Sequence, residues 1–166
     1  MTNQTRGVVF IHSAPAALCP HVAWAVGAAV GQPLRFDWSP QPAEPHAYRA
    51  EQVWHGSAGL AVRLTSTLRR FPELRFEVTE EPTARTEGLR FSFTPNLGLF
   101  QATTGPSGDI VVPETRLREV MRQAAVRHRD LPQALRRLLG EAWDDELEPF
   151  RYAGEAEPVR WLRQVV

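Results

Sequence analysis

Apolar residues alternate with arginine and an acidic residue in three short segments of the first half of the chain. Leu-Arg-Phe-Asp-Trp occupies 34–38, Tyr-Arg-Ala-Glu occupies 48–51, and Leu-Arg-Phe-Glu-Val occupies 74–78. A period of two is typical of a half-buried β-strand with its apolar side chains on one face. We therefore expect three strands, at 34–38, 48–54 and 74–79, that turn arginine and a carboxylate toward solvent. The arginines expected on one sheet face, and the acids expected beside them on neighbouring strands, are Arg35, Arg49 and Arg75 with Asp37, Glu51 and Glu77.

The residues between these segments predict two helices and one more strand. The apolar run at 7–11 indicates a buried strand, and valines recur at helical spacing within 20–30. Ser57 is the expected N-cap of a helix that ends near Arg70. The order strand, helix, strand, strand, helix, strand is that of a ferredoxin-like βαββαβ sheet. We predict an α+β fold with this core at residues 6–82.

The second half of the chain predicts a β-hairpin followed by helices. The expected elements are strands at 89–94, 97–103 and 110–112, a helix that begins at Pro113, and a helix from Asp130 to Trp143. These elements extend the core over residues 83–166. Residues 1–166 are expected to form a single domain, as their number allows.

The amino-acid composition of the chain makes some classes of binding partner less expected than others. The net charge is zero, with 19 basic and 19 acidic residues, and a nucleic-acid partner is not expected because phosphate neutralisation needs a basic surface. Every basic residue is arginine, which is typical of a GC-rich genome; selection for bidentate anion contacts is the alternative. Because no apolar run is long enough for a membrane span, we expect a cytoplasmic protein with no membrane partner.

The richest local chemistry lies between the first strand and the first helix. His12, Ser13, Cys19 and His21 gather there, and a helix N-terminus offers free N–H groups to an anion. These four residues are our candidate ligand-binding site, with a phosphopantetheine or carboxylate group as the natural guest. The alternative is structural: His12 and Ser13 satisfy backbone groups, and Cys19 packs as a small apolar side chain.

No metal and no cofactor are expected. Cys19 is the single cysteine, so a disulfide or a thiolate zinc cluster cannot form within the chain. The remaining candidate ligands, His12, His21, His46 and His55, lack the i, i+4 spacing of a helical zinc site.

An acidic cluster lies at positions 144–148, which we expect at the C-terminal end of the last helix. Negative charge opposes the helix dipole at that end, so nearby arginines should offset it. Arg151, Arg160 and Arg163 are the candidates. Paired carboxylates also suit acid–base catalysis or Mg²⁺ binding, but a salt-bridged structural role is the favoured interpretation.

Five blocks, at 6–13, 37–45, 75–82, 148–155 and 159–161, together resemble an actinobacterial family catalogued as domain of unknown function 3145. The resemblance spans nearly the whole chain. It implies a cytosolic protein without an assigned activity. It also implies an association with fatty acid synthesis, and hence an acyl-chain or acyl-carrier-protein partner.

Three functional hypotheses follow. The leading one is a non-enzymatic accessory domain that binds a small molecule or a protein. The alternative is an enzyme that acts on an acyl or phosphorylated substrate through the loop from His12 to His21. The third is an interaction protein that docks a partner through its sheet face or its aromatic tail, and formation of a homo-oligomer stays open.

Overall fold

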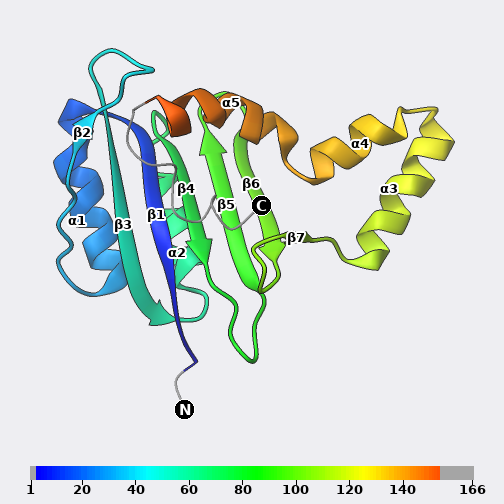
Figure 1. Ribbon diagram of the computed structural model, residues 1–166, viewed down its shortest axis with the longest axis horizontal. Coiled ribbons are helices and arrows are strands. Elements are labelled where there is room, and N and C mark those ends of the chain that lie inside the picture. The colour runs from blue at the N-terminus through cyan, green and yellow to red at the C-terminus, as the bar shows by residue number, and fades with distance from the viewer. Residues whose placement is uncertain (1–2, 154–166) are drawn as a thin grey trace.

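The computed structural model describes residues 3–153, which contain one seven-stranded antiparallel sheet (Figure 1). The strands lie in the order β2-β3-β1-β4-β5-β6-β7. They are β1 (Gln4–Pro15), β2 (Ser39–Pro40), β3 (Ala47–Ser57), β4 (Arg75–Glu80), β5 (Gly88–Thr94), β6 (Gly98–Thr104) and β7 (Ile110–Val111). The helices are α1 (Cys19–Val30), α2 (Leu60–Leu68), α3 (Glu114–Arg127), α4 (Leu131–Leu138) and α5 (Glu141–Tyr152). The predicted α+β class is confirmed.

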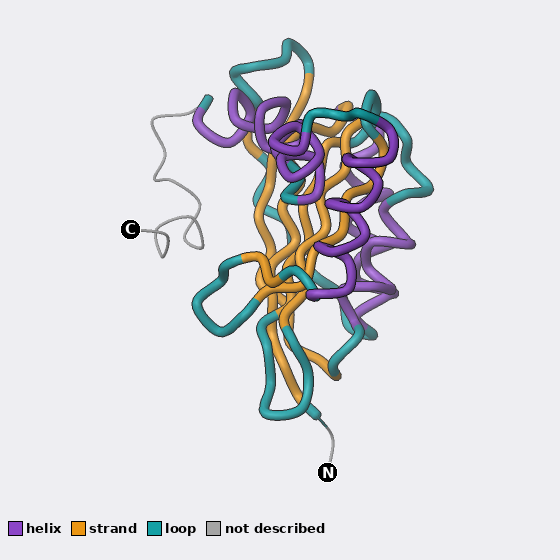
Figure 2. The backbone as a smooth tube through the Cα atoms, turned by 90° about the vertical axis from the view of Figure 1, so that its right-hand side faces the viewer, coloured by secondary structure: helices purple, strands orange, loops and turns teal. Residues whose placement is uncertain are grey.

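Helices lie on both sides of the sheet, which Figure 2 shows edge-on. On one side α1 and α2 cover the hydrophobic core, where Trp54, Leu64 and Phe76 are fully buried. On the other side α5 crosses β1 and β5. Helices α3 and α4 extend past the edge of the sheet beyond β7 (Figure 1). The sheet therefore separates the hydrophobic core from a second layer, beneath α5, that contains buried polar and charged side chains.

The apolar run and the alternating segments predicted most strands correctly. The strands expected at 7–11, 48–54 and 74–79 are confirmed as β1, β3 and β4, and the expected hairpin is confirmed as β5 and β6. In β1 and β4 consecutive residues are buried, because helices cover both faces of the sheet.

The strand expected at 34–38 is wrong. Phe36 is buried in the core and its ring stacks on Trp38, so the apolar residues do face inward. Pairing with β3 is limited to Ser39 and Pro40, which form β2. Proline carries no N–H for a sheet ladder, so this edge is short.

Two helix boundaries also differ from expectation. The helix expected from Asp130 to Trp143 is broken at Gly140, which has a left-handed backbone (φ 78°). A Cβ atom at this position would lie 2.5 Å from the Phe100 ring, so close packing as well as conformation requires glycine. Ser57 does not cap α2; it ends β3, and Gly59 is the N-cap.

The arginine prediction holds only in part. Arg49 and Arg75 lie two residues from Glu51 and Glu77, which both pair with Phe10, so the four share one sheet face. Arg35 lies outside any strand, because 33–38 is irregular. Glu77 is not turned to solvent either: α5 covers it, and its exposed fraction is 0%.

Glu80 supplies the N-terminal cap that Ser57 does not. The N–H groups of Gly59 and Ala61 donate to its two carboxylate oxygens at 2.8 and 2.9 Å.

We expect Glu80→Gln to lower the free energy of unfolding by about 1–2 kcal/mol, because the amide offers one acceptor where two are used. Urea denaturation tests this. Glu81→Gln, which removes an exposed pair with Arg6, is the matched control and should leave stability unchanged; equal effects would contradict the cap.

Candidate functional site

The buried carboxylate of Glu77 lies at the centre of the sheet face beneath α5. His12 Nε2–H donates to its Oε2 at 2.7 Å, and Ser92 Oγ–H donates to its Oε1 at 3.0 Å. Arg151 of α5 donates through Nε at 3.0 Å and through a terminal nitrogen at 2.5 Å, and Arg90 lies 3.2 Å away. One carboxylate thus joins three strands to α5.

Strand register explains why these residues meet. Glu77 pairs with Ser92 on β5, and Thr79 pairs with Arg90, so all four side chains leave the same face. His12 lies two residues after Phe10, which pairs with Glu77, so alternation places His12 on the same face. A β-bulge follows, because Ile11 pairs with Phe76 and Ser13 with Arg75, and it brings Ser13 to this face as well.

A second carboxylate completes the cluster. Asp144 accepts from Arg90 at 2.5 Å and from Arg151 at 2.9 Å. Two guanidinium groups therefore lie between two carboxylates. We call His12, Glu77, Arg90, Asp144 and Arg151 the Glu77 cluster.

The charges of the cluster hold Glu77 ionised. Burial by itself would raise the pKa of Glu77, but the hydrogen bond and charge of His12 and the charges of Arg151 and Arg90 keep that pKa well below its usual range. Burial would likewise lower the pKa of Arg151, yet Glu77 and Asp144 raise it. A carboxylate surrounded by donors and closed to solvent is suited to fixing α5 in place rather than to moving protons.

A smaller group flanks the cluster at the end of α5. Glu44 accepts from Ser13 and, at 3.0 Å, from Arg75. The Arg75 guanidinium also lies 4.4 Å from the centre of the Phe150 ring, a cation–π contact. The loop that contains Glu44 is thereby tied to β1, β4 and α5.

The other end of α5 is fixed to the β5–β6 hairpin. Trp143 packs on Phe100 with ring centres 5.2 Å apart, and its indole N–H donates to the Gly98 carbonyl at 2.9 Å. Glu146 accepts from Thr94 and Asn96 at 3.0 Å each. Since both ends are held, α5 has a defined position on the sheet.

The structure does not bring the four predicted site residues together. His12 and Ser13 lie beneath α5, where they are 2% and 1% exposed. Cys19 begins α1 on the opposite side of the sheet, and burial raises the pKa of its thiol, which makes it a poor nucleophile. His21 is exposed on the same helix. Glu77, Arg90 and Arg151, which sequence reasoning missed as site residues, are the groups that His12 meets.

The acidic cluster lies at the start of a helix, not at the end of one as expected. Asp144 is in the first turn of α5, where negative charge favours the helix dipole. Of the expected partners, Arg151 does pair with it, while Arg160 and Arg163 lie outside the described residues.

Residues 3–153 contain no group of three or more side chains placed to hold a metal ion. Within the same range no helix has the length and apolar character of a membrane span. One shallow groove runs along α3 and is lined by Glu114, Leu117, Arg118 and Met121. Another lies beside Arg6, His55 and Glu81 at the far end of the sheet.

Comparison with family models gives one finding. The model described as "Protein of unknown function (DUF3145)" matches residues 8–164. The chain belongs to this family. No curated protein and no solved structure matches this chain. Membership in DUF3145 confirms the resemblance drawn from the sequence blocks and assigns no activity.

Loss of the Glu77 charge should destabilise the fold strongly. In Glu77→Gln, Arg90 and Arg151 stay buried with one carboxylate fewer, and breaking such a pair costs about 3–5 kcal/mol. The free energy of unfolding in urea measures this. Glu73→Gln, an exposed change four residues earlier in the chain, is the control; a Glu77 variant as stable as this control would show that the cluster is not an anchor.

The same carboxylate predicts an acid dependence of stability. Because the pKa of Glu77 in the folded protein lies below its unfolded value of about 4.3, its contribution is complete above that pH and is lost as pH falls through the folded pKa. The stability difference between the natural protein and Glu77→Gln should therefore shrink on acidification from about pH 5 to about pH 3. Urea denaturation across this range tests the sign, and parallel curves would contradict it.

Proposed function

We propose that this protein is a non-enzymatic, protein-binding accessory domain, and that its binding surface is the helical arm formed by α3 and α4 (residues 114–139). The observation that carries this proposal is that the arm projects beyond the sheet (Figure 1), while Leu117 and Met121 on α3 are exposed. Amphipathic helices in stable domains bury such a face, and an exposed one marks an interaction site.

The open face results from a mismatch in helix length. α3 has 14 residues and α4 has 8, which correspond to about 21 Å and about 12 Å. Ala124 near the end of α3 is buried, whereas Leu117 and Met121 nearer its start are 37% and 53% exposed. These two line the groove on α3, together with Glu114 and Arg118.

Both ends of the arm are connected to elements that pack on or pair with the sheet. β7 leads into α3 and pairs with β6. At the other end Gly140 packs against Phe100 and opens α5, which Trp143 and the Glu77 cluster hold to the sheet. A preorganised surface of this kind lowers the entropic cost of binding a partner.

The charge of the arm indicates the chemistry of its partner. Residues 114–139 contain seven arginines and three acidic residues, a net charge of +4 in a chain whose total is zero. An acidic protein surface would complement it. The acyl-carrier partner expected from the family resemblance remains a proposal that this charge favours.

Two features weigh against the catalytic alternative. The polar groups that resemble a catalytic set, His12 and Glu77, lie beneath α5 and are at most 2% exposed. Cys19 and His21 lie on the other side of the sheet. An enzyme working through the loop from His12 to His21 would need α5 to leave its position.

The finer fold assignment is also a proposal. Within residues 4–80 the elements follow the order β1, α1, β2, β3, α2, β4, and the sheet order β4-β1-β3-β2 agrees with a ferredoxin-like unit. The two-residue β2 departs from it.

Photo-crosslinking in cells tests the proposed function. A photoreactive amino acid at Met121 should yield protein adducts, because this side chain lies in the groove of the arm. The same residue at Val53 is the control, since this strand position has a similar exposed fraction, 45% against 53%. Adducts at neither position, or only at Val53, would overturn the proposal that the arm binds protein.

A further inference from the structure

We propose that the partner of the arm is a second copy of this chain. The arm of one copy docks on the outer face of α5 in the other, and the second arm repeats the contact, which gives a twofold dimer. This inference rests on the proposed function, since it names the occupant of the same surface.

The outer face of α5 carries an acidic stripe. Glu141, Asp145 and Glu148 are exposed and follow one another at spacings of four and three residues, which places them on one side of the helix. The other two acids of α5, Asp144 and Glu146, are engaged with Arg90 and Arg151 and with Thr94 and Asn96. The sheet therefore neutralises the inner acids of α5, and the outer ones remain.

The arm carries the opposite charge in a form that is available for binding. Arg116, Arg127, Arg129 and Arg137 are exposed and form no ion pair within residues 3–153. On the stripe, Asp145 and Glu148 likewise form none within that range, whereas Glu141 lies 3.4 Å from Arg136. The arm has a net charge of +4 and the stripe has three carboxylates, so the two surfaces have opposite charge.

Apolar groups accompany the charges on both surfaces. Leu117 and Met121 are open on the arm, and Tyr152, 53% exposed, continues the stripe of α5 four residues beyond Glu148. Exposed ion pairs contribute little affinity by themselves, but they steer association and fix register. The apolar contacts are expected to supply most of the affinity.

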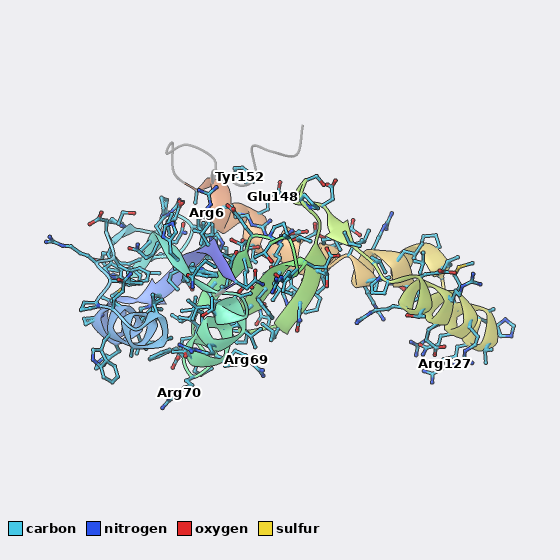
Figure 3. All side chains as sticks on the ribbon, turned by 90° about the horizontal axis from the view of Figure 1, so that it is seen from below. Arg6, Arg69, Arg70, Arg127, Glu148 and Tyr152 are labelled. Atoms are coloured by element: carbon cyan, nitrogen blue, oxygen red, sulfur yellow. The ribbon has the colours of Figure 1, made fainter. Side chains whose placement is uncertain are left out.

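Within one copy the arm reaches only the first residue of the stripe, where Arg136 lies 3.4 Å from Glu141. Figure 3 places Arg127 at the far end of the arm, distant from Glu148 and Tyr152 on the body of the molecule. Asp145 and Glu148 of the stripe and Arg127 and Arg129 of the arm, which form no ion pair within residues 3–153, can therefore meet between copies. A twofold arrangement uses both pairs of surfaces and closes the assembly, whereas a single head-to-tail contact would leave them open to further addition.

Charge reversal in the full chain tests the inference by sedimentation equilibrium. The natural protein should be dimeric, with a dissociation constant that rises with salt. Asp145→Arg with Glu148→Arg, and separately Arg127→Glu with Arg129→Glu, should each weaken dimerisation about tenfold or more through like-charge contacts. An equimolar mixture of the two variants should recover association, because one of the two reciprocal contacts is then restored with reversed sign.

A matched control uses Arg69→Glu with Arg70→Glu. These exposed arginines lie at the end of α2, remote from α5 and the arm (Figure 3). The control should dimerise as the natural protein does, and circular dichroism should show that all variants remain folded.

The outcomes separate this inference from the proposed function. A monomeric natural protein, or a dimer that neither reversal weakens, overturns docking between copies. If the residue at Met121 then crosslinks a different protein, the arm still binds a partner and only its identity changes. If Met121 crosslinks no protein at all, both proposals fail.

Discussion

The pairing of Glu77 with Arg151 is the interaction on which the second layer of this structure depends. It joins residues 74 positions apart and buries both, at 0% and 5% exposure. Replacing such a buried pair by apolar residues is often neutral in stability, so its main effect is to specify position. Here a guanidinium in the last turn of α5 must meet one carboxylate, while Trp143 holds the first turn. The direction of α5, and with it the base of the arm, follows from these two constraints.

Much of the sheet could be predicted because its signals are local. A continuous apolar run revealed β1, alternation over a few residues revealed β3, β4 and the hairpin, and a proline marked the start of α3. The failures occur where a distant contact decides the outcome. The segment at 34–38 has the pattern of a strand but borders an edge limited by Pro40, and α2 takes its cap from Glu80 rather than from adjacent Ser57.

The candidate site was harder to predict for a related reason. Alternation assigned Glu77 to the face opposite the core, which is correct, but the pattern does not say whether a helix covers that face. The sequence did contain a signal that charged residues lie on the buried side of α5. Spacings of three and four residues place Asp144 and Arg151 on the same side of the helix as the fully buried Leu147. His12 follows the same alternation, since it lies two residues after Phe10, but the bulge brings Ser13 to the face of Glu77 and breaks the period on which such reasoning relies.

The two sides of α5 thus have separate roles. The inner side has its charges matched by arginines and hydrogen-bond donors of the sheet, so it holds the helix and offers nothing to a partner. The outer side keeps three carboxylates that the sheet does not reach, and the arm that continues from the same helix through Gly140 keeps the excess arginines. Since the anchoring and the exposed groups share no partners, changes to one set should add independently to changes in the other. This separation keeps the charges of the arm and of the outer face of α5 apart from the charges that hold the fold together.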